Sequence, residues 1–175
     1  MRTKQISATE LLEQTFHRID RINPTLNAIV WECREEAMIR ARRADEALAK
    51  GQAVGALHGV PVTIKEAFAY QGSPNTWGLP ALKDAKSPRT AAAVERLESA
   101  GAIVVGKTNV PVMLGDWQSD NPIYGTTNNP WDVARTAGGS TGGGAAAVAA
   151  GLGALTLGSD LNGSIRIPAH FQAIP

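Results

Sequence analysis

The sequence predicts an α/β fold, in which helices pack against a β-sheet. Short β-branched runs, typical of buried strands, alternate along the chain with longer segments that have the composition and periodicity of helices. This alternation favours a layered α/β arrangement. The 175 residues suffice for one domain, and 43% of them are hydrophobic, so a core can form.

The first predicted helix covers residues 7–22. Ser7 and Glu10 form a capping box, because each side chain can bond the backbone N–H of the other residue. The dipeptide Asn23-Pro24 should stop this helix, since proline cannot continue the backbone hydrogen bonding.

A second helix and a first strand follow. Residues 32–50 are rich in Ala, Glu and Arg, and Gly51 should close the helix that they form. Residues 60–64 are β-branched and apolar, which predicts a buried strand that ends at Lys65. The polar segment 71–87 contains glycine and proline and is predicted to be a loop.

The next predicted unit is another helix followed by another strand. Ser87 is suited to the N-cap of a helix that runs to residue 100, and Pro88 to its first position. Gly101 should end this helix, and the apolar residues 102–106 should form a strand.

The remaining segments are less regular. Residues 107–138 contain three prolines and little periodicity, so we expect a long irregular segment, which is often functional. A helix begins within the following glycines and continues through residues 145–150. Residues 154–157 and 165–167 are predicted to be short strands.

Composition and charge restrict the function classes. The formal net charge of +1 argues against nucleic acid or an anionic membrane as the main partner. The single cysteine, Cys33, cannot form an internal disulfide, which fits a reducing compartment. Because no apolar signal core or run of about 18 apolar residues is present, we expect a cytoplasmic protein without a membrane partner.

One motif resembles a nucleotide site but stands in the wrong context. Residues 101–108, GAIVVGKT, match the phosphate-loop pattern letter for letter. That motif needs a preceding strand and a following helix. Here a predicted helix precedes it and its middle residues favour a strand, so we interpret Gly101 as a helix end, the middle residues as a buried strand and Lys107 as the residue at the end of that strand.

The histidines and tryptophans give weaker signals. The three histidines are scattered without a cysteine or carboxylate cluster, so we expect neither a metal nor another cofactor. Three tryptophans could line a pocket, although core or loop packing is the more ordinary role: Trp77, Trp117 and Trp131.

Two hydroxyl groups and one lysine suggest a hydrolase. Glycines on both sides surround Ser140 and Thr141, and Ser164 lies in a second glycine-marked turn. Lys65 could act as a base if burial keeps it neutral, or it could simply extend into solvent from the strand end. The backbone N–H groups before Ser164 could stabilise an oxyanion or form an ordinary turn.

The chain resembles the amidase signature family over nearly its whole length. The matching segments follow in the family's order: LNAIV, LHGVPVTIKE, ERLESAGAIVVGKTNVP, DNPIYGTTNNPWD, GGSTGGGAAAVAAGL and GSDLNGSIRIPA. The resemblance implies a mixed β-sheet flanked by helices. It also implies a Ser-Ser-Lys triad, with Lys65 as base, Ser140 as the bridging serine after a cis peptide bond, and Ser164 as nucleophile.

The resemblance also assigns the oxyanion donors and exposes departures from the family pattern. The donors would be the backbone N–H groups of Leu161, Asn162, Gly163 and Ser164. Four residues differ from those usual in the family: Thr141 for a second serine, Glu66 for aspartate, Asn162 for glycine and Val112 for glutamate. Thr141 keeps a hydroxyl beside the substrate site.

The family domain is more than twice as long as this chain. We therefore predict that residues 1–175 form the N-terminal part of a single amidase domain, truncated so that the C-terminal half is absent. A truncated sheet would expose apolar surface, which would favour a homo-oligomer. The triad should be present, but the isolated chain should be poorly active or inactive.

The predicted function is that of an amidase. Such a hydrolase cleaves the C–N bond of a small carboxylic amide through an acyl-enzyme, and the sequence does not identify the amide. One alternative is a catalytically inactive amidase fragment that serves as a binding or assembly piece. A second is a glutaminase like the ammonia-supplying component of the glutamyl-tRNA(Gln) amidotransferase, although two of the segments above look more like those of stand-alone amidases.

Overall fold

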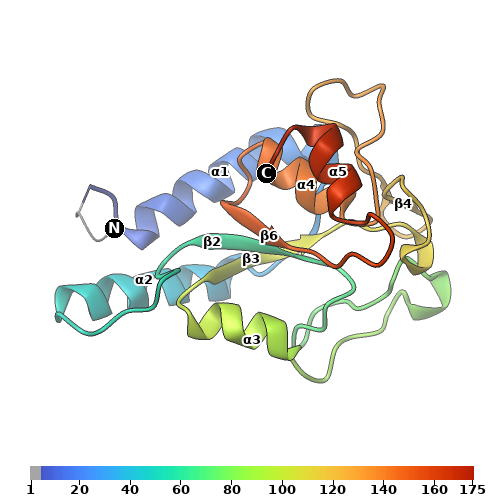
Figure 1. The fold of residues 1–175 in the computed structure, drawn as a ribbon. Coiled ribbons are helices and arrows are strands. Elements are labelled where there is room, and N and C mark those ends of the chain that lie inside the picture. The colour runs from blue at the N-terminus through green and yellow to red at the C-terminus, as the bar shows by residue number, and fades with distance from the viewer. Residues whose placement is uncertain (1–4) are drawn as a thin grey trace.

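The computed structural model describes residues 5–175 and contains a four-stranded mixed sheet with helices on both faces (Figure 1). The strand order is β1-β3-β2-β6. Strand β3 (Ile103–Thr108) pairs antiparallel with β1 (Ile29–Glu32) and parallel with β2 (Pro61–Lys65), and β2 pairs parallel with β6 (Leu155–Leu157). The predicted α/β class and the mixed sheet are therefore confirmed.

Helices cover both faces of this sheet. Figure 1 shows α1, α4 and α5 above the strands and α3 below them. The helices are α1 (Ala8–Leu26), α2 (Arg34–Ala49), α3 (Ala92–Ser99), α4 (Gly142–Ala149) and α5 (Arg166–Gln172). Short elements occupy the irregular segments: the 3₁₀ turns η1 (Pro80–Leu82) and η2 (Val112–Leu114) and the strands β4 (Asp120–Asn121) and β5 (Gly125–Thr126).

Two hydrophobic clusters form the core, one on each face. The first joins α1, α2 and α4 to β3, with Leu12 and Val105 fully buried in it. The second joins α3 to β2 and β3 and contains Val62, Val94 and Val104. Alternate residues of β3 thus belong to opposite clusters, as the two-residue period of a strand requires.

Helix α1 begins as predicted and ends later than predicted. The Ser7 hydroxyl accepts a hydrogen bond from the Glu10 N–H at 3.0 Å, and the Glu10 carboxylate accepts one from the Ser7 N–H at 2.9 Å. The prediction that Asn23-Pro24 stops the helix is wrong. Proline in the last turn removes only one intrahelical bond. The helix therefore continues to Leu26, and Asn27 caps it with a left-handed backbone, φ 50°.

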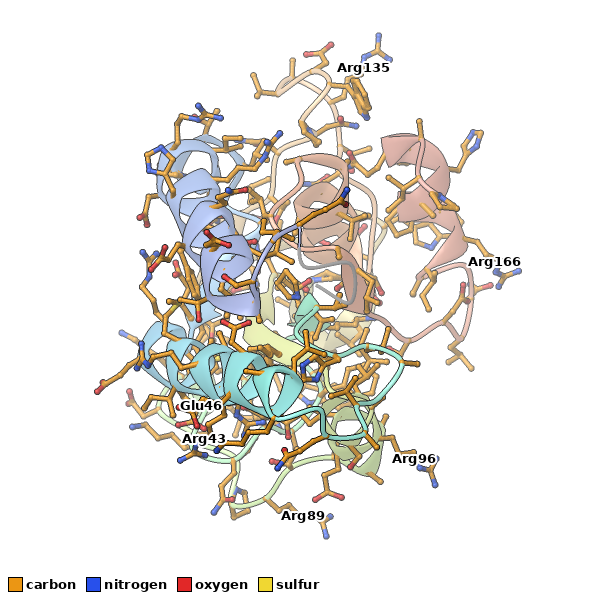
Figure 2. The ribbon with its side chains drawn as sticks, turned by 90° about the vertical axis from the view of Figure 1, so that its left-hand side faces the viewer. Arg43, Glu46, Arg89, Arg96, Arg135 and Arg166 are labelled. Atoms are coloured by element: carbon orange, nitrogen blue, oxygen red, sulfur yellow. The ribbon has the colours of Figure 1, made fainter. Side chains whose placement is uncertain are left out.

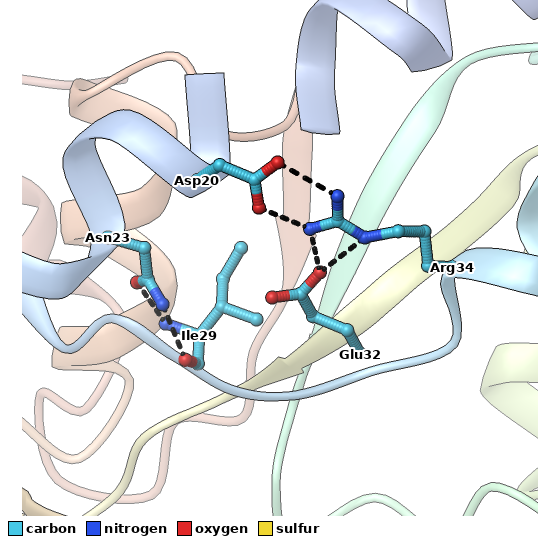
Figure 3. A network of polar contacts seen from close by, with 5 residues as sticks. All are labelled: Asp20, Asn23, Ile29, Glu32 and Arg34. Carbon is cyan, nitrogen blue, oxygen red and sulfur yellow. Dashed lines mark hydrogen bonds and ion pairs between the residues drawn. The ribbon is translucent and has the colours of Figure 1, made fainter. Parts of the chain in front are cut away.

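Polar side chains then fix the path from α1 into β1 and α2 (Figure 3). The Asn23 side chain accepts a hydrogen bond from the Ile29 N–H at 2.9 Å and donates one to the Ile29 carbonyl at 2.8 Å. Arg34 pairs with Asp20 at 2.6 Å and with Glu32 at 2.8 Å. These contacts tie the start of α2 to both preceding elements.

Further charged side chains lie on the outside of the helices. Figure 2 shows Arg43 and Glu46 on α2 and Arg96 on α3 pointing away from the ribbon, and all three are exposed. These side chains form a solvated surface around the core.

One predicted helix start is wrong, because Ser87 does not cap a helix and α3 begins only at Ala92. Instead the Ser87 N–H donates to the Ser73 carbonyl, and the Ser87 carbonyl accepts from the Gly72 N–H, both at 2.9 Å. Ser87 therefore closes the preceding loop, and its backbone groups are used there.

The predicted strand at residues 165–167 is also wrong, because these residues lead into α5. The Asp160 carboxylate accepts hydrogen bonds from the backbone N–H groups of Ile165 at 3.0 Å and Arg166 at 3.2 Å. An acidic side chain in this position satisfies the first N–H groups of a helix. Pro168 then lies in the first turn of the helix, where proline is tolerated.

The phosphate-loop pattern has the structure that its context predicted. Gly101 follows α3 with a left-handed backbone, φ 94°, and a buried strand follows it. This strand runs to Thr108, two residues beyond its predicted end, so Lys107 lies within β3 and is fully buried. No helix in residues 5–175 has the length and apolar composition that would let it cross a membrane.

Candidate active site

The candidate site lies at the carboxyl end of β2, where open α/β sheets usually bind ligands. Lys65 is the last residue of β2 and its side chain is fully buried. Its Nζ is hydrogen-bonded to Ser140 Oγ at 2.7 Å and to Ser159 Oγ at 3.0 Å, and it donates to the Ser159 carbonyl at 3.2 Å. The alternative that Lys65 extends into solvent is therefore wrong.

Burial changes the acidity of this amine. Removal from water disfavours the charged ammonium and lowers the Lys65 pKa to about 8, while the negative charge of Asp160 acts in the opposite direction. A neutral amine has a lone pair that can accept a proton from a hydroxyl. Lys65 thus has a position and an acidity suited to a general base toward Ser140.

Ser140 is held in a tightly packed glycine segment. The Gly139–Ser140 peptide bond is cis, and Ser140 is buried. A side chain on Gly139 would begin 2.4 Å from the Asp116 carbonyl oxygen, and one on Gly143 would begin 2.5 Å from the Asn109 backbone nitrogen. Glycine is therefore required in this segment, because neighbouring backbone occupies the space of a Cβ atom.

Ser164 lies beside this segment. Its carbonyl accepts a hydrogen bond from the Thr141 N–H at 3.0 Å, and 9% of its surface is exposed. Within residues 5–175, no hydrogen bond joins the side chains of Ser140 and Ser164. The structure thus brings Lys65 and Ser140 into direct contact and connects Ser164 to them through the neighbouring backbone.

The turn before Ser164 is organised by Asp160. Its carboxylate accepts the Gly163 N–H at 2.7 Å and pairs with the Arg166 guanidinium at 2.9 Å, and Figure 2 shows Arg166 on the surface at this end of α5. The Gly163 N–H is therefore occupied. In the described part of the chain, the N–H groups of Leu161, Asn162 and Ser164 have no protein acceptor.

Thr141 also contributes to the Lys65 environment. Its hydroxyl donates to the Ser159 carbonyl at 3.5 Å, the same oxygen that accepts from Lys65. Neither Ser159 nor Asp160 was singled out from the sequence. Both lie in the segment GSDLNGS, which follows β6 and ends at Ser164. Their place in this glycine-marked turn is the sequence feature that could have pointed to them.

The three tryptophans that could have lined a pocket are not core residues. Trp77, Trp117 and Trp131 expose 37%, 55% and 69% of their surface. A hydrogen bond from Trp131 Nε1 to the Gln172 carbonyl at 2.8 Å ties the loop of Trp131 to the end of α5. Residues 5–175 contain no cluster of three or more histidine, cysteine or acidic side chains that could hold a metal ion.

The fold is that of an amidase signature enzyme. A sequence model described as Amidase matches residues 10–174, and the chain belongs to this family. The structure superposes with a TM-score of 0.92 on a bacterial aryl acylamidase of the amidase signature family, with 38% identity over 97% of this chain and 35% of that one.

Two curated relatives show how broad the family is. The chain is 47% identical to an indoleacetamide hydrolase of Bradyrhizobium diazoefficiens over 99% of its own length and 33% of the relative. It is 44% identical to one component of the glutamyl-tRNA(Gln) amidotransferase of Anaeromyxobacter dehalogenans over 98% of its length and 35% of that protein. The chain thus spans about a third of the length of the relatives that it matches.

Proposed function

We propose that this chain carries the catalytic residues of an amidase that hydrolyses small carboxylic amides through an acyl-enzyme. The observation that carries the proposal is the 2.7 Å contact between the fully buried Lys65 amine and the Ser140 hydroxyl. A buried lysine with a lowered pKa is a base near neutral pH, and a serine needs such a base to become a nucleophile.

In the proposed chemistry, protons pass from Ser164 to Ser140 and from Ser140 to Lys65. Ser164 Oγ attacks the amide carbonyl while its proton passes to Ser140, and the Ser140 proton passes to neutral Lys65. The proton returns by the same route to the leaving nitrogen as the C–N bond breaks, which leaves an acyl-enzyme and a free amine. Water then attacks the ester carbonyl with the same relay, the ester C–O bond breaks, the carboxylic acid leaves, and Ser164 regains its proton.

The exposed turn before Ser164 would stabilise the negative charge that forms on the carbonyl oxygen. The N–H groups of Leu161, Asn162 and Ser164 have no acceptor within residues 5–175 and can donate to an oxyanion. Asp160 has a positioning role, since its bonds to Gly163, Ile165 and Arg166 hold the turn in shape.

The names of the relatives favour an amide that carries an aromatic group. One is an indoleacetamide hydrolase and another an aryl acylamidase. A glutaminase function is the second candidate, because the amidotransferase component is similar at 44% identity. Hydrolysis of glutamine in preference to phenylacetamide would favour this second candidate.

Covalent labelling tests the proposal. We expect a fluorophosphonate probe to modify the purified chain at Ser164, which peptide mass spectrometry can locate. Ser164→Ala should abolish the label, whereas replacement of the exposed Ser99 by alanine should leave it intact. Labelling at another residue, or none at all in the folded protein, would reject the proposal and favour the alternative of a non-catalytic binding piece.

A further inference from the structure

Two bulky apolar residues in the segments that follow β2 and β3 have an unusual backbone. Trp77 and Met113 both have left-handed conformations with φ 53°, and they expose 37% and 57% of their surface. The Met113 N–H donates to the Trp77 carbonyl at 2.8 Å, so the two residues are joined. Bulky residues rarely adopt this conformation, and where they do it is often part of a functional site.

Buried charges hold the Trp77 loop in place. The Glu66 carboxylate is fully buried and accepts hydrogen bonds from the N–H groups of Thr76 at 2.6 Å and Trp77 at 3.0 Å. Lys107, also fully buried, donates to the Pro74 carbonyl. The opposite charges of Glu66 and Lys107 attract each other, so these two residues together fix three backbone groups of one loop.

Chain connections and one packing contact link this loop and the segment that carries Met113 to the proposed catalytic segment. Glu66 directly follows Lys65 in the chain. The segment that carries Met113 continues to Trp117, whose Cα lies 3.0 Å from the place where a side chain on Gly139 would begin. In Figure 1 the segments that follow β2 and β3 both run at the right-hand ends of these strands.

We propose that Trp77 and Met113 form an apolar wall that binds the aromatic group of the amide substrate, and that Glu66 is the residue that positions this wall. The inference rests on the proposed function and names the residues that select its substrate. An aromatic ring binds favourably to a flat apolar surface, because stacking contributes binding free energy in addition to that from the buried apolar area. Neither Trp77 nor Met113 belongs to the two hydrophobic clusters of the core.

Binding to an acylation-deficient protein tests the wall without relying on turnover. The probes are phenylacetamide and butyramide, with dissociation constants measured by NMR titration of the Ser164→Ala variant. We expect phenylacetamide to bind more tightly. Adding Trp77→Ala should reduce the preference for phenylacetamide over butyramide about tenfold, and Trp77→Phe should retain most of it.

The positioning role of Glu66 needs a separate comparison in the same background. Glu66→Gln should reduce the preference for phenylacetamide, and Glu66→Asp, which keeps the charge, should restore part of it. The exposed Glu95→Gln on α3 is the matched control and should leave the preference unchanged. If Glu66→Gln impairs folding, the double variant Glu66→Gln/Lys107→Met, which buries no unpaired charge, replaces it.

The outcomes separate the wall from the proposed function. Equal preferences in the parent and the Trp77→Ala variant, or no preference for the aromatic amide in the parent, would overturn the wall. An unlabelled Ser164 in the otherwise native protein would reject the proposed function even if the Trp77-dependent preference were found, because binding is measured independently of acylation.

Discussion

Lys65 and Lys107 lie near the ends of two paired strands, and their comparison shows how the contacts of two equally buried lysines differ. Strands β2 and β3 pair Ile64 with Lys107 and Lys65 with Thr108. Both lysines are fully buried, and burial lowers the pKa of each to about 8. Burial and acidity therefore do not distinguish them.

Their partners do. Lys65 contacts the hydroxyls of Ser140 and Ser159, which can give up a proton as well as accept one. Lys107 contacts the backbone carbonyl of Pro74, which can only accept, and it faces the charge of Glu66. The first lysine can thus take part in a proton relay, whereas the second can only anchor a loop.

The largest expected effect separates the two lysines by reactivity. Lys65→Met should slow fluorophosphonate labelling of Ser164 by roughly 10³-fold, because removal of a general base typically has an effect of this size. Lys107→Met should slow it by less than about tenfold, since Lys107 contacts a carbonyl and not a hydroxyl that could give it a proton. Equal losses in the two variants, measured on folded protein, would contradict the distinction.

The second prediction concerns the contribution of Lys107 to the free energy of unfolding. Lys107→Met leaves the Glu66 carboxylate buried without its counter-charge and should lower the free energy of unfolding by about 3 kcal/mol. Glu66→Gln/Lys107→Met should lower it by less than the single Lys107 substitution. Denaturant unfolding curves measure both values, and a double variant less stable than Lys107→Met would show that the two charges are not coupled.

A third prediction concerns the pH dependence of Ser164 labelling, which should follow the protonation of Lys65. Lys65 must be neutral to accept a proton, so labelling of Ser164 should increase as pH rises to about 8 and then level off. The Asp160 charge raises the Lys65 pKa, so Asp160→Asn should move this rise to lower pH. The same substitution loosens the oxyanion turn and should reduce the maximal rate at least about tenfold.

The control for that experiment is Asp132→Asn, which removes the charge of an exposed acid. It should keep the parent pH profile, because Asp132 lies in the loop after β5 and pairs with Arg135. A shift of the Asp160 variant to higher pH would have the wrong sign and would contradict the electrostatic assignment.

The smallest effect is expected far from both lysines. Arg34 pairs with Asp20 and Glu32 on the surface (Figure 3), and exposed ion pairs contribute little to stability. Arg34→Met should therefore lower the free energy of unfolding by at most about 1 kcal/mol and leave the labelling rate unchanged. A loss as large as that of Lys107→Met would mean that the surface network is structurally essential.

Much of the fold could be predicted because local chemistry and tertiary packing agree. The Ser7–Glu10 capping box, the Gly101 helix end and the buried β-branched strands all form where their side chains indicate. The prediction failed where a group outside the predicted element forms hydrogen bonds with the backbone of that element. Ser87 bonds to Ser73 instead of capping α3, and Asp160 turns residues 165–167 into a helix start.

The candidate site was predictable only in part. The family resemblance predicted that Lys65, Ser140 and Ser164 form one site, and the structure joins the first two directly. The roles of Ser159 and Asp160 depend on how one turn folds back over Lys65, which no local pattern in the sequence specifies. The same holds for Lys107, whose environment depends on the Glu66 loop.

The central claim is that Lys65 is a base held against Ser140, and an NMR titration of its side chain tests this most directly. Lysine-selective ¹³C labelling, with the Lys65 signal assigned by its loss in Lys65→Met, gives the pKa of the amine. We expect a value of about 8 that changes in Ser140→Ala. A pKa near the ordinary lysine value of about 10.4, insensitive to the loss of Ser140, would contradict the claim.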